Sequence, residues 1–219
     1  MLAPVMKMTK EELRVVSTKR CKHGHTYLEH YNCYLEEVAP EKVGFLDIEA
    51  SDLKANFGIM LSYCIKDANS DKIWFDTVNE KDLKGDLDKR LVTHCIEDMK
   101  RFDRVIGHYS TKYDIPFIRT RAIVWGLDFP RFGELNHTDT YYMAKRLLCL
   151  HSNRQNVVAE AIQGEDIKTR ITPQYWIRAL QGHKESIEYI LDHNKKDVLQ
   201  LEGNYNKLVQ YSRKSIKSI

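Results

Sequence analysis

The sequence lacks the features of a secreted or membrane-spanning protein. Its longest stretch without Asp, Glu, Lys or Arg is the 11 residues from Ala55 to Ile65, whereas a helix that crosses a bilayer needs about 20 apolar residues. No apolar run of signal-peptide length precedes Lys10, and the five cysteines are an odd number that does not suit a disulfide framework. We therefore expect a cytoplasmic protein without a membrane partner.

Proline and net charge are also scarce. The 219 residues include 5 Pro and 10 Gly, and 34 basic against 31 acidic residues leave a formal net charge of +3. This balance permits a nucleic-acid partner without demanding one. Because 42% of the residues are apolar and 10% are aromatic, the chain can bury a core, which excludes a disordered protein. Its length fits one domain, placed at residues 41–219, with an N-terminal appendage at residues 1–40.

Periodicity predicts a layered α/β arrangement. A capping box at Thr9 and Glu12 starts a helix over residues 10–20, and turn signals separate short strands from one another. The strands are predicted over residues 42–49, 57–66, 72–78 and 104–109, with a fifth that ends at Asp139, and further helices over residues 80–102, 115–125 and 184–211. Strands followed by helices favour an α/β domain around one sheet.

Two acidic residues interrupt the first apolar strand. Alternate side chains of a strand share a face, so Asp47 and Glu49 lie next to each other on the face of Phe45. Neighbouring carboxylates at the end of a buried strand repel each other, and a divalent cation with oxygen ligands, Mg²⁺ or Mn²⁺, removes that repulsion. The alternative is a strand end that emerges into water with two solvated acids.

Further polar residues follow the fourth strand and interrupt the last helix. Asp114 precedes a proline-containing helix start, so it either caps that helix or belongs to a site. His193 and Asp197 are spaced i and i+4 on one helix face, and with Asn194 they break an apolar stripe. Such a break favours a site or a satisfied polar network, although His193 alone is also typical of a helix surface. Asp139 belongs either to the outer part of the site or to a helix cap.

Together these residues resemble the DEDD superfamily of 3′–5′ exonucleases, which has a ribonuclease H-like (DnaQ-like) fold. An Asp-x-Glu, a later Asp and a His-x₃-Asp occur in the order and spacing of that superfamily, from about residue 42 to 208. Tyr113-Asp-Ile-Pro-Phe117 and Asn194-Lys-Lys-Asp197-Val198 are similar to motifs of the YprB-type predicted exonucleases. The resemblance implies an α/β ribonuclease H-like fold with a mixed five-stranded sheet flanked by helices.

Two positions depart from the superfamily pattern. Tyr109 stands five residues before Asp114, where the superfamily often has Asn. His193 stands at the spacing of a Tyr-x₃-Asp motif, while Asp192 takes the place of the histidine in His-x₄-Asp. The departures concern the proton acceptor more than the metal site.

The resemblance implies a divalent-metal-dependent 3′–5′ exonuclease that hydrolyses terminal phosphodiester bonds, with DNA as the expected substrate. Two Mg²⁺ or Mn²⁺ ions would activate a water and stabilise the leaving oxygen. The implied metal ligands are Asp47, Glu49, Asp114 and Asp197. His193 is the candidate general base because histidine titrates near neutral pH. The expected substrate is a single-stranded 3′ end, and the expected partners are a separate polymerase or repair and replication proteins.

Two other functions stay open. A non-catalytic nucleic-acid-binding domain would keep the fold without turnover, although several unpaired acids in a cleft argue against it. An endonuclease of the same fold would cut a circular strand. The side chains expected to contact nucleic acid are Tyr109, Lys112, Lys168 and Arg170. Basic residues of this kind are also common on solvated surfaces.

The appendage contains a Cys/His-rich segment. Cys21, His25, His30 and Cys33 are close enough in sequence for a compact Cys₂His₂ zinc site, with His23 as an alternative to His25. Thiolate and imidazole ligands suit Zn²⁺, and a closed four-ligand site is structural. The spacing matches no standard zinc finger, so the alternative is a polar segment that leads into the first strand.

Overall fold

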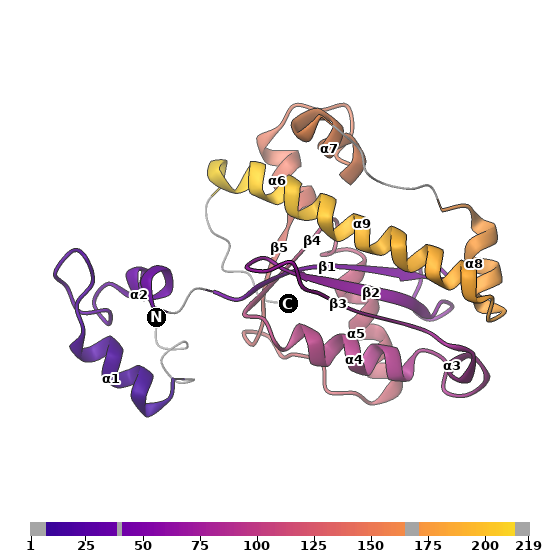
Figure 1. Cartoon of the computed structure of the whole chain (residues 1–219), viewed down its shortest axis with the longest axis horizontal. Helices are drawn as coiled ribbons and strands as arrows, with labels where there is room; N and C mark the ends of the chain where they lie inside the picture. The colour runs from indigo at the N-terminus through magenta and orange to yellow at the C-terminus, as the bar shows by residue number, and fades with distance from the viewer. Residues whose placement is uncertain (1–7, 39–40, 165–170, 213–219) are drawn as a thin grey trace. The chain divides into compact units, whose positions relative to one another are not determined.

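A computed structural model describes residues 8–38, 41–164 and 171–212 of the chain. The chain divides into two compact units, residues 1–41 and residues 42–219 (Figure 1). No helix among the described residues is both long and apolar enough to cross a membrane.

Where the N-terminal unit is described, at residues 8–38 and 41, it holds two short helices, α1 (Lys10–Thr18) and α2 (Tyr31–Glu37). The predicted capping box is present, because Thr9 and Glu12 exchange hydrogen bonds at the start of α1. A single β-bridge joins Arg20 to Thr26 between the helices. The buried apolar side chains described for this unit are Val16, Cys21, Tyr27, Cys33 and Tyr34.

The second unit is built on one mixed sheet of five strands, in the order β3-β2-β1-β4-β5. The strands are β1 (Val43–Ala50), β2 (Met60–Asp67), β3 (Ile73–Thr77), β4 (Arg104–Gly107) and β5 (Asn136–Asp139). β1 pairs antiparallel with β2 and parallel with β4, β2 pairs antiparallel with β3, and β4 pairs parallel with β5. The predicted fold class, a mixed five-stranded α/β sheet flanked by helices, is therefore confirmed.

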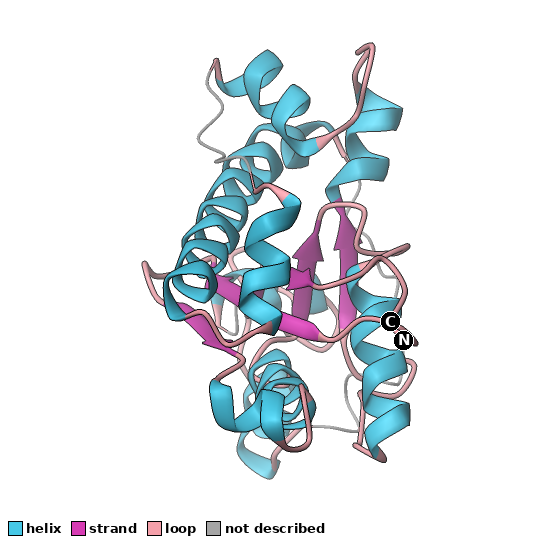
Figure 2. Cartoon of the chain, turned by 90° about the vertical axis from the view of Figure 1, so that its right-hand side faces the viewer, coloured by secondary structure: helices cyan, strands magenta, loops and turns pink. Residues whose placement is uncertain are grey.

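Helices cover both faces of this sheet, as Figures 1 and 2 show. The long helix α9 (Lys184–Leu208) packs across β1 and β2 on one face, where Phe45 meets Val198 and Leu201. On the other face, Leu46 and Ile48 join the main core with α4 (Lys89–Met99) and α5 (Asp114–Trp125). Three further helices contact α9, namely α6 (Thr140–Leu147), α7 (Gln155–Gln163) and α8 (Pro173–Leu180). The α9 helix is followed by one 3₁₀ turn, Val209–Tyr211.

The single helix predicted over residues 80–102 is wrong, because the chain breaks it into α3 (Glu80–Lys84) and α4. Leu87 adopts a left-handed backbone conformation, with φ of 51°, between the two helices. The next residue, Asp88, is fully buried and accepts hydrogen bonds from Arg121 and from the backbone N–H of Met60. We attribute the break to this buried ion pair, which holds the chain out of helical register between α3 and α4.

Candidate active site

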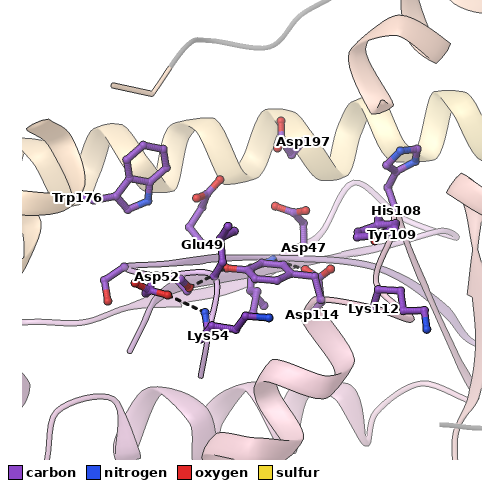
Figure 3. A pocket seen from close by; sticks show the side chains of 15 residues that line it. Asp47, Glu49, Asp52, Lys54, His108, Tyr109, Lys112, Asp114, Trp176 and Asp197 are labelled. Atoms are coloured by element: carbon purple, nitrogen blue, oxygen red, sulfur yellow. Dashed lines mark hydrogen bonds between the residues drawn. The ribbon is translucent and has the colours of Figure 1, made fainter. Parts of the chain in front are cut away.

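The end of β1 directs two carboxylates toward α9 (Figure 3). Because side chains alternate along a strand, Asp47 and Glu49 share the face of Phe45, while Ile48 points into the opposite core. Oδ2 of Asp47 accepts a hydrogen bond of 2.6 Å from Nδ2 of Asn194. Oε1 of Glu49 lies 3.6 Å from Nε2 of His193. The face predicted for both acids is the face that they occupy.

Helix α9 adds a histidine and a third carboxylate. Nε2 of His193 lies 3.5 Å from Oδ2 of Asp197, one helical turn further along, and the His193 side chain is only 12% exposed. One side-chain oxygen of Glu49, one of Asp197 and one ring nitrogen of His193 all lie within 4.8 Å of one another. His193 is therefore not a helix-surface histidine. Asp192 is on the outside of the helix, where its 57% exposed side chain pairs with Lys196.

The fourth carboxylate, Asp114, reaches the site from the start of α5. It does not cap that helix, since Tyr113 holds the N-cap position and Asp114 is the first helical residue. Instead, Oδ1 of Asp114 accepts a hydrogen bond of 3.1 Å from the backbone N–H of Ile48, beside Asp47 and Glu49. The β1 backbone thereby holds this buried carboxylate in place.

Burial, helped by the negative charges of Asp139 and Asp197 and opposed by hydrogen bonds from backbone N–H groups, raises the pKa of Asp114 to about 7. The largest cause is burial, because a carboxyl group removed from water favours its neutral form. A carboxyl group in this state keeps a proton near neutral pH unless a cation favours its charged form. Its raised pKa is typical of a functional site.

Asp139 has the capping role that was one of its two predicted alternatives. Its Oδ1 accepts from the N–H of Tyr141 at the start of α6 and from the N–H of Tyr109, and its Oδ2 accepts from the N–H of Thr111. Tyr109 adopts a left-handed conformation with φ of 61°, so the strand predicted over residues 104–109 ends early, at Gly107. Non-glycine residues are strained in this region and hold it only when neighbours fix them.

A cavity of about 680 Å³ lies between these elements. The four predicted metal-ligand carboxylates line it, together with Tyr109 and Lys112 from the predicted nucleic-acid contacts. Lys168 and Arg170 lie outside the described residues. His193 is not itself a lining residue, but its Nε2 lies next to the carboxylates of Glu49 and Asp197, which are.

The cavity also contains side chains that the sequence analysis did not select, among them Lys54, His108 and Trp176. Nε1 of Trp176 is buried and has no hydrogen-bond partner among the described residues. His108 is held by Thr140 through Nδ1 and by the carbonyl of Asn153 through Nε2. No local spacing in the sequence predicts that Trp176 or His108 lies at this cavity, because α8 and the β4–α5 loop reach it only through the tertiary fold.

The Cys/His-rich segment forms its own cluster in the N-terminal unit, with one change from the prediction. The side chains that converge are Cys21, His23, His30 and Cys33. The cluster therefore contains His23, the predicted alternative, in place of His25. The turn Cys21–Gly24, closed by a hydrogen bond from the N–H of Gly24 to the carbonyl of Cys21, carries His23 to the two sulfur atoms.

Comparison with known proteins agrees with the fold of the second unit. A family model described as the RNase_H superfamily matches residues 44–209. A solved structure of the family B DNA polymerase from the hyperthermophilic archaeon Pyrobaculum calidifontis is similar, with a TM-score of 0.59 and 17% identity over 76% of this chain. The chain covers 25% of that polymerase, about a quarter of its length. No significant match was found among curated proteins.

Proposed function

Because the chain belongs to the RNase_H superfamily, we propose that it is a divalent-metal-dependent nuclease, and specifically a 3′–5′ exonuclease of the DEDD type. The observation that carries the proposal is the convergence of four carboxylates from β1, α5 and α9 around one cavity, with His193 beside them. These acids come from three segments that are far apart in sequence, and their mutual repulsion costs stability unless a cation binds there. Because the similar structure is a DNA polymerase, DNA is the substrate that we propose to test first.

The donor set fits Mg²⁺ or Mn²⁺. Asp47, Glu49, Asp114 and Asp197 offer hard oxygen ligands, which these ions prefer over nitrogen and sulfur. Two of them, Asp114 and Asp197, are only 3% and 4% exposed, a burial that anions tolerate when a cation neutralises them. When bound, two such ions would polarise the phosphate, activate the attacking water and stabilise the leaving oxygen.

The chain's own residues have separable roles in this proposal. His193 takes the proton from the attacking water, since it lies between Glu49 and Asp197 and is nearly buried. Asn194 orients Asp47 through its amide. Lys112 and Lys54 line the cavity and are placed to meet phosphate oxygens of the substrate.

Tyr109 is the proposed contact for a terminal base. Its side chain is 45% exposed at the cavity, and its ring lies edge-on to Tyr141, with the centroids 4.9 Å apart. Aromatic side chains of this kind stack on unpaired bases without reading their sequence. A single-stranded end can present such a base, which supports the proposed single-stranded 3′ end. A separate polymerase or repair protein as partner stays a prediction.

The test is an assay with oligonucleotides labelled at the 3′ or the 5′ end, as single- and double-stranded DNA and RNA, in Mg²⁺, Mn²⁺ or EDTA. We expect metal-dependent, stepwise shortening from the 3′ end. Asp47→Ala should abolish it while the fold survives, because removing one of several repelling acids relieves the metal-free site. The control is Asp52→Asn, which changes another acid that lines the same cavity. Oδ1 of Asp52 accepts a hydrogen bond from the backbone N–H of Lys54 in a local turn.

Other results would overturn parts of the proposal. Cleavage of a circular single strand would identify an endonuclease, because an exonuclease needs an end. Tight binding without any shortening, under all metals, would identify a non-catalytic nucleic-acid-binding domain. Equal loss of activity in Asp47→Ala and Asp52→Asn would show that the carboxylates have been wrongly assigned.

A further inference from the structure

The N-terminal unit brings two thiols and two imidazoles together at short, nearly equal separations. Nδ1 of His23 lies 3.9 Å from Sγ of Cys21 and 3.3 Å from Sγ of Cys33. Nδ1 of His30 lies 3.6 Å from each of the same two sulfur atoms. All four atoms are within 4.8 Å of one another. Four donors therefore surround one point.

These separations match the edges of a zinc tetrahedron. With Zn–S bonds of about 2.3 Å and Zn–N bonds of about 2.0–2.1 Å, a tetrahedral angle places sulfur and nitrogen about 3.5–3.6 Å apart. The four measured sulfur–nitrogen distances, 3.3, 3.6, 3.6 and 3.9 Å, lie on both sides of that value. We propose that Cys21, His23, His30 and Cys33 bind one structural Zn²⁺ ion.

The backbone around the cluster supports this assignment. Gly24, with φ of 82°, permits the tight turn after His23, and the N–H of Cys21 donates to the carbonyl of His25. On the other side, His30 is the N-cap of α2, and the N–H of Cys33 donates to the carbonyl of His30. One pair of ligands thus comes from a turn and the other from the first turn of a helix. Backbone hydrogen bonds thus position both pairs.

The size of the unit gives the ion a role. The unit spans 41 residues, and domains near 40 residues seldom bury enough apolar surface to fold without a metal or a disulfide. Two of its five described buried apolar residues are the cysteines themselves, each 5% exposed. A bound ion would join the α1 side of the unit, through Cys21, to α2, through Cys33. We therefore expect folding of this unit to depend on zinc.

Other occupants suit the cluster less well. Mg²⁺ and Mn²⁺ prefer oxygen ligands, whereas thiolate and imidazole donors select zinc, so this site is chemically distinct from the carboxylate site. A disulfide would use both sulfur atoms, but no disulfide joins Cys21 to Cys33 in this structure. His25 has its ring centroid 5.1 Å from that of His30 and is not in the four-ligand cluster. It is thus a neighbouring histidine of the same type that can serve as a control.

The experiment measures metal in the full-length chain, produced without a histidine tag, by elemental analysis and by native and denaturing mass spectrometry. We expect one zinc per chain in the wild type and in His25→Asn, and less than a tenth of that in Cys33→Ser and His23→Asn. Replacement of zinc by Co²⁺ should give the absorption bands of a tetrahedral thiolate site. Limited proteolysis should cut residues 8–38 in the two ligand variants and leave the second unit intact.

Several results would overturn the proposal. The proposal is wrong if the wild-type chain binds neither Zn²⁺ nor Co²⁺ when they are supplied. It is also wrong if the denatured mass is lower by two hydrogens, which indicates a Cys21–Cys33 disulfide. Loss of zinc in His25→Asn with full zinc in His23→Asn would reverse the ligand assignment. None of these readouts uses nuclease activity, so they remain informative if the proposed nuclease function fails.

Discussion

The amide Nδ2 of Asn194 on α9 donates a hydrogen bond of 2.6 Å to Oδ2 of Asp47 on β1, across 147 positions of sequence. The other end of the same amide accepts from the hydroxyl of Ser62, at 3.3 Å. A carboxylate only accepts hydrogen bonds, so this arrangement fixes which end of the amide faces Asp47. Asn194 is fully buried, and the residue that breaks the apolar stripe of α9 thus holds an acid of the site.

The first prediction concerns this contact. Asn194→Ala should lower the affinity for Mg²⁺ or Mn²⁺ by about 10–100-fold, because partners that orient a metal ligand have effects of that size. Isothermal titration with the metal alone measures it directly. Ser62→Ala removes only the outer hydrogen bond and should have a smaller effect. If Asn194→Ala binds metal as the wild type does, Asn194 is only a packing residue.

The second prediction separates His193 from its neighbour Asp192. His193→Ala should lower turnover by about 10²–10⁴-fold, the usual contribution of a general base. Metal affinity should change little, because His193 is not a proposed ligand. Asp192→Ala should leave turnover nearly unchanged, since this side chain points outward to Lys196. If Asp192→Ala abolished activity and His193→Ala kept it, the assignment of His193 as the general base would be refuted.

The third prediction follows from the pKa of Asp114. This pKa is about 7 in the folded chain, raised by burial above the ordinary 3.8. The folded state therefore binds more protons than the unfolded state between these values, so its stability without metal falls as pH rises from about 4 to beyond 7. Urea unfolding in EDTA at several pH values gives the slope. Asp114→Asn removes the titrating group and should therefore reduce the dependence of the free energy of unfolding on pH in this range.

If the free energy of unfolding changed with pH equally in the wild type and in Asp114→Asn, this prediction would be contradicted. Histidines also titrate in the same pH range. The difference between the two proteins, rather than either curve alone, is therefore the quantity to compare.

The fourth prediction concerns the indole of Trp176. Trp176 lines the cavity, and its buried Nε1 has no hydrogen-bond partner among the described residues, so we expect it to donate a hydrogen bond to a phosphate oxygen of the substrate. Trp176→Phe keeps an aromatic ring but removes the donor, so KM should rise about 10-fold, as expected for one hydrogen bond to a charged group, with kcat less affected. Trp74→Phe is the control, because Trp74 is on β3 under Lys72 and Arg101. An unchanged KM in Trp176→Phe would exclude this contact.

Local periodicity was enough to predict much of the sheet and the faces of the acids. The period of two in β1 placed Asp47 and Glu49 on one side, and the i, i+4 spacing placed His193 over Asp197. Both rules act within one element, where backbone geometry alone decides the direction of a side chain. The catalytic and ligand roles of these residues stay predictions.

Contacts between distant elements could not be predicted in the same way. The pairing of Asn194 with Asp47 depends on how α9 crosses the sheet, and no local pattern encodes that crossing. The buried contact of Asp88, between α3 and α4, is with Arg121, a residue of another helix. The choice of His23 over His25 depends on a turn with a left-handed Gly24, since both histidines fit the sequence spacing.

Helix α9 carries the site and the core on consecutive turns. Asn194 and Asp197 face the acids of β1, and Val198 and Leu201 pack directly after them against Phe45 and neighbouring core residues. A local opening that separated His193 and Asp197 from β1 would also pull these apolar side chains into water. Amide protons along this helix should then exchange with solvent only when the whole unit opens. Heat would therefore inactivate the site and unfold the domain in one cooperative event.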